Sequence, residues 1–143
     1  MFTIDASVHI NALNPSEAGS AESQLCLQRL VAMRQPLFSP TLLLVEVVAA
    51  IARVLDDADM ALELAGGIQA LPRQLWIPLD NDIAEMAARL GAQSRLRGAD
   101  AVYAAVARRY GAILITRDHQ QLERVAALVQ VMTPEDVLVN LLS

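Results

Sequence analysis

The sequence contains no lysine, because all 11 of its basic residues are arginine. That absence excludes a P-loop lysine, a Schiff-base lysine and a Ser-Lys dyad. It also argues against receiver domains and against most phosphatases with an aspartyl nucleophile, since both usually place a lysine beside the phosphoryl group.

Cysteine and aromatic residues are also scarce. Cys26 is the only cysteine, so neither an intrachain disulfide nor a thiolate zinc site is possible, and a buried structural thiol is expected. Aromatic residues make up 3% of the chain, which argues against a base-stacking platform for single strands. The two histidines, His9 and His119, are too far apart in the sequence to suggest a histidine metal site.

No segment predicts a signal peptide or a membrane span. The N-terminus lacks a basic region followed by an apolar core, and the apolar stretch from Leu42 to Ala52 is too short to cross a bilayer and contains Glu46. We therefore expect a cytoplasmic protein with no membrane association. A length of 143 residues predicts one domain, spanning residues 1–143.

Charge is unevenly distributed along the chain. The net charge of −5 is not that of a typical nucleic-acid binder. Residues 83–127, however, hold seven arginines and four acids, so this stretch carries 7 − 4 = +3. Two interpretations stay open: the arginines solvate helix faces, or they form a basic rim around an acidic centre.

Short apolar segments alternate with longer segments of helical periodicity. The expected strands are 2–5, 36–38, 75–79, 112–116 and 128–132. The expected helices are one from about residue 8, then 21–33, 40–55, 58–71, 81–96, 99–110, 120–126 and one from about residue 134. This alternation predicts an α/β fold with a mostly parallel sheet covered on both faces.

Three helix starts carry capping patterns. Ser7 is expected to cap the first helix, and Ser39 is expected to cap the helix that has Pro40 at its first position. Thr133 precedes a proline and two acids, which favours a helix start there as well. These patterns set the expected N-terminal boundaries of the three helices.

Four carboxylates stand where they need a compensating charge or a metal ion. Asp5 ends the first strand, Glu46 interrupts an apolar helix, Asp100 opens a helix, and Asp118 follows the strand at 112–116. Desolvating an acid is costly, and parallel α/β sheets gather ligands at the carboxyl ends of their strands. A divalent cation with oxygen ligands is the simplest reason to bring these acids together.

Each acid alone also has a plain structural interpretation. Asp100 is favourable in a first helical turn because of the helix dipole, and Asp118 can end a strand in a turn. Arg53 can compensate the charge of Glu46. The combination of the four, rather than any one of them, favours a site.

In their order and spacing, the motifs around these acids resemble the PIN domain, the nuclease fold of VapC-type toxins. The matching segments are 5–8, 40–46, 98–103, 114–118 and 131–136. The resemblance covers essentially the whole chain. It implies a PIN-like three-layer α/β/α fold with a mostly parallel central sheet.

The resemblance implies an endoribonuclease that requires Mg²⁺ or Mn²⁺ and leaves a 5′-phosphate and a 3′-hydroxyl. The catalytic residues that it implies are Asp5, Glu46, Asp100 and Asp118. The three aspartates would hold the metal directly or through water, and Glu46 would ligate a metal or position the attacking water. Ser7 and Thr116 fall where the family often places a supporting hydroxyl.

The resemblance also implies partners: an RNA substrate, a small antitoxin and a second copy in a homodimer. The apolar helices within residues 40–71 can supply either protein interface. A first rival is a catalytically silent PIN-like module that binds RNA or protein. A second is a phosphotransfer enzyme with Asp5 as nucleophile, but such enzymes usually carry a second aspartate two positions later, where this chain has Ser7.

Overall fold

The structure is a computed structural model that describes residues 1–142. Its strands are β1 (Phe2–Ile4), β2 (Leu37–Pro40), β3 (Gln74–Ile77), β4 (Ile113–Ile115) and β5 (Val131–Met132). Its helices are α1 (Ala6–Ala12), α2 (Ser20–Ala32), α3 (Leu42–Leu55), α4 (Ala58–Gln69), α5 (Asn81–Ser94), α6 (Gly98–Tyr110), α7 (His119–Val125) and α8 (Pro134–Asn140). The predicted alternation of strands and helices is confirmed.

The five strands form one parallel sheet in the order β3-β2-β1-β4-β5. β1 lies at the centre, where Phe2 pairs with Leu37 of β2 on one side and with Ile113 of β4 on the other. The chain moves outward from β1 to β3 and then crosses to β4, so the strand order reverses between β1 and β4. Ligands of open α/β sheets bind outside the carboxyl ends of the strands at such a reversal.

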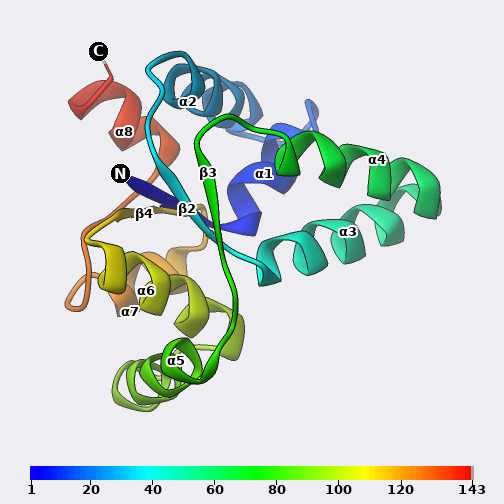
Figure 1. Cartoon of the computed structure of the whole chain (residues 1–143). Coiled ribbons are helices and arrows are strands. Elements are labelled where there is room, and N and C mark those ends of the chain that lie inside the picture. Colours follow the sequence, from blue (N-terminus) through cyan, green and yellow to red (C-terminus); the bar gives the residue numbers. More distant parts are fainter. Residues whose placement is uncertain (143) are drawn as a thin grey trace.

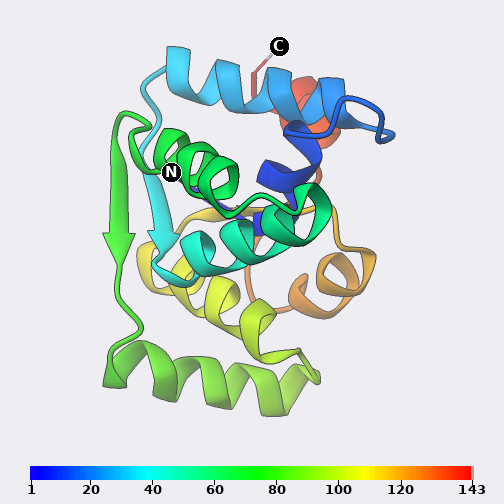
Figure 2. The ribbon, with the colours of Figure 1, turned by 90° about the vertical axis from the view of Figure 1, so that its right-hand side faces the viewer.

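Helices cover both faces of the sheet, as predicted. Figures 1 and 2 show α5, α6 and α7 on one side and α1, α2 and α8 on the other, while α3 and α4 form a hairpin that projects sideways. Helix α6 is buried continuously from Asp100 to Ala107, and four alanines in that run let it pack closely on the sheet. The α/β fold with a central parallel sheet is therefore confirmed.

Cys26 is a buried thiol in α2, as expected, and burial raises its pKa to about 11. A thiol that stays protonated and has no contact with solvent acts as a packing residue. Among residues 1–142, no helix is long and apolar enough to cross a membrane.

Two of the predicted helix caps are wrong. The first helix is capped by Asp5, whose carboxylate accepts a hydrogen bond from the backbone N–H of Ser7. Ser39 and Pro40 belong to β2, because their pairing with Trp76 and Ile77 of β3 extends the strand beyond the segment that pairs with β1. Helix α3 consequently begins at Leu42.

The third predicted cap is confirmed. Thr133 and Asp136 form a reciprocal capping box at the start of α8, with Pro134 in the first turn. Here the whole pattern lies within one turn of chain, so no distant segment competes with it.

Candidate active site

Asp5 directly follows the central strand β1 and is only 6% exposed. Its Oδ2 accepts hydrogen bonds from the Ser7 N–H at 3.0 Å and from the Thr116 hydroxyl at 3.3 Å. The same carboxylate therefore caps α1 and faces the loop that follows β4. A second oxygen, Oδ1, is left for another ligand.

Two hydroxyl groups connect this carboxylate to the β4–α7 loop. The hydroxyls of Ser7 and Thr116 lie 3.4 Å apart. Ser7 Oγ accepts the N–H of Arg117 at 3.1 Å, and Thr116 Oγ1 accepts the N–H of Asp118 at 3.1 Å. Ser7 and Thr116 thus position the backbone that carries Asp118 next to Asp5.

Glu46 reaches the site from the middle of α3. Its Oε2 accepts a 2.6 Å hydrogen bond from the hydroxyl of Tyr103, which is fully buried on α6. Arg53, the compensating partner expected from the sequence, forms no ion pair with Glu46; the polar partner of this carboxylate is Tyr103. Burial and the charge of Glu46 raise the pKa of Tyr103, so the hydroxyl stays protonated and remains a donor.

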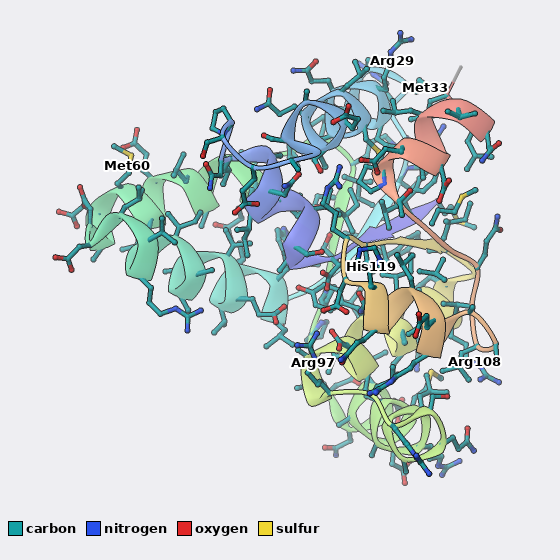
Figure 3. The ribbon with its side chains drawn as sticks, turned by 180° about the vertical axis from the view of Figure 1, so that it is seen from behind. Arg29, Met33, Met60, Arg97, Arg108 and His119 are labelled. Carbon is teal, nitrogen blue, oxygen red and sulfur yellow. The ribbon has the colours of Figure 1, made fainter. Side chains whose placement is uncertain are left out.

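Asp100 and Asp118 lie at the starts of α6 and α7. Asp100 occupies the first turn of α6, and Asp118 is the N-cap of α7, where its Oδ1 accepts the Gln121 N–H at 3.0 Å. The guanidinium of Arg97 bridges the two acids: its Nε lies 3.0 Å from Asp100 Oδ2, and its Nη2 contacts Asp118 Oδ2. Arg97 is visible in Figure 3 at the start of α6.

All four predicted acids line one cavity of about 540 Å³. They come from four separate positions in the fold: the end of β1, the middle of α3, the start of α6 and the start of α7. Ser7, Arg53 and Arg97 line the same cavity, whereas Thr116 is fully buried behind Asp5. The cavity lies at the strand-order reversal between β1 and β4.

The electrostatics of the cavity are those of crowded carboxylates. Burial raises the pKa of Asp5, and the nearby charge of Asp100 raises it further, against the hydrogen bonds from Ser7. Burial also raises the pKa of Glu46, with added repulsion from Asp5 and Asp100. For Asp118 burial acts in the same direction, but the Gln121 N–H and Arg97 outweigh it and hold its pKa below the ordinary value.

The donor set fits a hard divalent cation. Carboxylate oxygens are the ligands that Mg²⁺ and Mn²⁺ prefer, and a cation would offset the burial and the repulsion that together raise the pKa values of Asp5 and Glu46. As the side chains stand, no three acidic, histidine or cysteine side chains within residues 1–142 are arranged to hold a metal ion. Asp100 and Asp118 are instead paired with Arg97.

Arg117 anchors the loop that carries Thr116 and Asp118. Its guanidinium donates to the Ser23 hydroxyl at 2.6 Å, to the Gly19 carbonyl at 2.6 Å and to Glu135 at 2.7 Å. A Cβ atom at Gly19 would lie 2.3 Å from Arg117 Nη1, so a larger residue there would have to displace the guanidinium. Arg117 therefore joins the site to α2 and α8.

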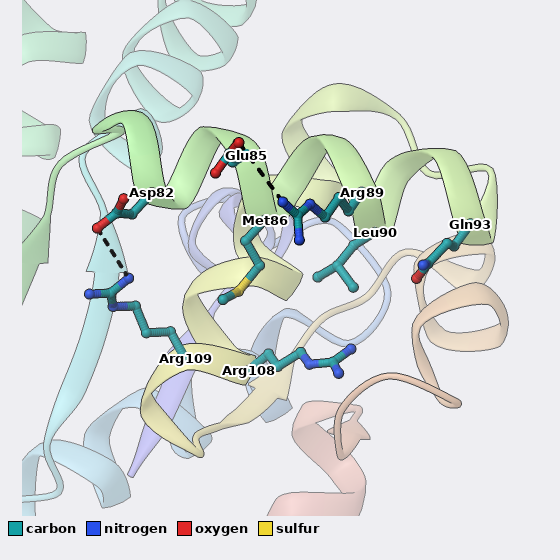
Figure 4. Close-up of a pocket in the computed structure, with 8 residues that line it drawn as sticks. All are labelled: Asp82, Glu85, Met86, Arg89, Leu90, Gln93, Arg108 and Arg109. Carbon is teal, nitrogen blue, oxygen red and sulfur yellow. Dashed lines mark ion pairs between the residues drawn. The ribbon is translucent and has the colours of Figure 1, made fainter.

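Most of the arginine-rich stretch lies away from the acids. Arg89, Arg108 and Arg109 line a different cavity of about 390 Å³ between α5 and α6 (Figure 4). Arg109 and Arg89 face Asp82 and Glu85 there, at 4.0 and 3.8 Å. Among the described residues, Arg97 is the only one of the seven arginines that lines the acidic cavity. The solvated-face interpretation therefore fits this stretch better than a basic rim.

Three residues of this site were not predicted from the sequence to interact with the acids. Arg97 precedes Asp100 by three positions, a spacing at which opposite charges meet on a helix, so the pair could have been recognised. Tyr103 is a fully buried residue of α6, and its bond to Glu46 has no local sequence pattern. The contacts of Arg117 are equally distant in sequence.

The fold and the cavity define an α/β protein with an acidic crevice at the switch point of a parallel sheet. The sequence profile of the PIN domain matches residues 2–128, and the chain therefore belongs to the PIN domain family. Members of this family are typically metal-dependent nucleases.

Solved structures share the fold at low sequence identity. VapC20 of Mycobacterium tuberculosis, a toxin that cleaves the sarcin-ricin loop, superposes with a TM-score of 0.72 and 20% identity over 92% of this chain and 98% of its own. A toxin–antitoxin complex from Klebsiella pneumoniae superposes with a TM-score of 0.66 and 23% identity, over 94% of this chain and 98% of its own. VapBC2 of Rickettsia felis, bound to promoter DNA, superposes with a TM-score of 0.71 and 11% identity, over 92% of this chain and 97% of its own. No curated protein sequence matches the chain.

Proposed function

We propose that residues 1–143 form one nuclease domain that hydrolyses RNA phosphodiesters with the help of Mg²⁺ or Mn²⁺. The observation that carries this proposal is the convergence of Asp5, Glu46, Asp100 and Asp118, from four elements, on one cavity. Family membership supports it, since PIN domains are typically metal-dependent nucleases. RNA as the substrate would place the protein in the cytoplasm.

Asp5, Asp100 and Asp118 would hold the metal, which when bound supplies positive charge for the scissile phosphate and lowers the pKa of its water. Asp5 is held in place by Ser7 and Thr116, and Asp118 by its cap on α7. These bonds fix the carboxylates before any ligand arrives, which reduces the reorganisation that the reaction requires.

Glu46 would position the attacking water and take its proton. Its carboxylate is half-buried, has a raised pKa and is held by the Tyr103 hydroxyl through only one oxygen, Oε2. A carboxylate with a raised pKa is a stronger base than an ordinary one. Attack by hydroxide on phosphorus would break the bond to the 3′-oxygen, which takes up a proton and leaves a 5′-phosphate on the other fragment.

Cleavage of total RNA in Mn²⁺, in Mg²⁺ and in chelator tests this function. We expect metal-dependent cleavage by the wild type and a loss of at least about a hundredfold in Asp5→Asn and in Asp100→Asn. Asp59→Asn is the matched control, because Asp59 is an exposed acid on α4 outside the cavity. Full activity in highly purified Asp5→Asn protein would overturn the proposal. A folded wild type that binds RNA without cleaving it would favour the silent binding module.

We further propose that the chain is the toxin of a toxin–antitoxin pair. Two solved proteins with this fold were crystallised in such complexes, which supports the assignment. An apolar cavity of about 500 Å³ between α1, α2 and α4, lined by Leu13, Leu27 and Leu64 among others, could receive an antitoxin segment. We expect expression of this chain alone to slow growth. We also expect the adjacent reading frame to encode a small DNA-binding protein that restores growth when it is co-expressed. Growth that is unaffected by the chain alone contradicts it.

The same proposal includes a homodimer. Helices α3 and α4 expose several large apolar side chains, of which Val54 is 76% exposed and Leu62 is 59% exposed. Burial between two copies would remove such surface from water. We expect the wild type to sediment as a dimer and the Val54→Glu variant to sediment as a monomer. A monomeric wild type at all concentrations contradicts the dimer.

A further inference from the structure

Within residues 1–142, Arg97 is the one residue lining the acidic cavity whose side chain bridges two of the proposed metal ligands. It stands just before α6 with an extended backbone, and its side chain turns back over the start of the helix. The guanidinium contacts Oδ2 of Asp100 and Oδ2 of Asp118, which belong to different helices. A single positive group thus occupies the space between the two acids.

The Arg97 side chain is held by these two acids alone. It is 62% exposed, and no other hydrogen bond or ion pair within residues 1–142 involves its guanidinium. Arg117 offers the contrast, because its side chain is 20% exposed and bonded to three groups, two at the start of α2 and one on α8. Arg97 can therefore rotate into solvent without disturbing packing, whereas Arg117 cannot.

The Arg97 guanidinium takes up a lone pair on one oxygen of each acid and places a positive charge where a cation shared by the two acids would sit. A guanidinium N–H needs a carboxylate oxygen at about 2.7–3.0 Å, whereas Mg²⁺ needs one at about 2.0–2.1 Å and brings twice the charge. We propose that Arg97 competes with the divalent cation: it pairs with Asp100 and Asp118 in the metal-free protein and is displaced into solvent when the ion binds. This inference rests on the proposed metal site.

The competition has a calculable cost in metal affinity. Half-exposed ion pairs contribute little individually, so the loss of two of them weakens apparent metal binding by roughly two- to thirtyfold. The nuclease would then need a higher free metal concentration for activity than it would if Arg97 did not pair with the two carboxylates. The displaced guanidinium would remain at the rim of the cavity, where a phosphate of the substrate would approach.

Equilibrium binding of Mn²⁺ to RNA-free protein, followed by the electron paramagnetic resonance of free Mn²⁺, tests the competition. We expect Arg97→Gln to bind Mn²⁺ about two- to thirtyfold more tightly than the wild type. Arg53→Gln is the matched control. Arg53 lines the same cavity and carries the same charge, but forms no ion pair within residues 1–142. It should change the affinity by less than about twofold.

Three outcomes would overturn the inference. Equal affinity of wild type and Arg97→Gln excludes competition while leaving the metal site intact. An equal gain in Arg97→Gln and Arg53→Gln attributes the effect to net charge rather than to the bridge. Absence of Mn²⁺ binding in every variant overturns the proposed function together with the inference. Circular dichroism of each metal-free variant verifies that the fold is retained.

Discussion

The Tyr103 hydroxyl on α6 donates a 2.6 Å hydrogen bond to Oε2 of Glu46 on α3, although the two residues are 57 positions apart. The bond joins the helix that carries Asp100 to the helix that carries Glu46. Since Tyr103 is fully buried, its ring cannot follow Glu46 if that side chain turns away. The relative placement of two of the four acids therefore depends on this contact.

Removal of this hydroxyl should destabilise the protein. We expect Tyr103→Phe to lower the free energy of unfolding by about 1–2 kcal/mol at pH 7, because a hydrogen bond to a charged group is lost. Tyr110→Phe is the control, since that ring stacks on Phe38 and its hydroxyl forms no hydrogen bond to a side chain of residues 1–142. Urea denaturation of both variants checks the prediction. Equal losses in the two proteins would contradict it.

Asp5 should lower the stability of the metal-free protein at neutral pH. Burial, with the charge of Asp100, raises its pKa, so the folded state holds this proton more tightly than the unfolded chain does. Stability then falls as the pH rises through the pKa of the folded state. Asparagine cannot ionise and can still accept the Ser7 N–H.

We therefore expect Asp5→Asn to raise the free energy of unfolding by about 1 kcal/mol at pH 7 in chelator, although it abolishes cleavage. The gain should shrink toward pH 4, where the carboxyl group of the unfolded chain also becomes protonated. Urea denaturation between pH 4 and pH 8 measures this difference. A gain that is constant with pH would point to a cause other than ionisation.

Asp118 caps α7 and is proposed to hold the metal, and different substitutions separate these two roles. Asp118→Asn retains an oxygen for the Gln121 N–H, whereas Asp118→Ala removes the helix cap. We expect the alanine variant to be about 1 kcal/mol less stable than the asparagine variant, and both to lose metal-dependent cleavage. Thermal denaturation and RNA cleavage are measured on the same preparations. Full cleavage by Asp118→Asn would reduce Asp118 to a helix cap.

A side chain at Gly19 should destabilise the protein, because it would displace the Arg117 guanidinium. Gly19→Ala and Gly111→Ala both place alanine at a positive φ, +79° and +60°, but a Cβ atom at Gly111 meets nothing within 4 Å. We expect Gly111→Ala to cost about 1 kcal/mol and Gly19→Ala about 1–2 kcal/mol more, since Arg117 loses its hydrogen bonds. Urea denaturation compares them. Equal costs would mean that Arg117 moves aside freely.

The order of strands and helices could be predicted from the sequence because each element is marked within its own residues. Apolar runs such as Ile113–Ile115 and the capping box at Thr133 need no distant partner to be recognised. The helix start predicted at Ser39 and Pro40 was wrong because it depends on a distant segment. Pairing with β3 extends β2 through these two residues, although they locally favour a helix start. Tertiary pairing overrides the local preference there.

In the candidate site, too, the features set by local sequence were predictable and those set by long-range packing were not. Asp5 and Asp118 were predictable because they end strands whose carboxyl ends must meet at one edge of a parallel sheet. The partner of Glu46 was not predictable, because a nearby arginine on the same helix is the natural guess when only sequence distance is known. Tyr103 becomes its neighbour only when α3 and α6 pack on the sheet.

The hydrogen bond between Thr116 and Asp5 spans 111 residues and lies behind the acidic cavity. During synthesis, β1 leaves the ribosome first but cannot pair with β4 until that strand has emerged as well. Contacts between such distant segments form late in folding. The backing of the acidic cavity therefore assembles only after β1 and β4 have paired, so the acids on either side of it come together late in folding.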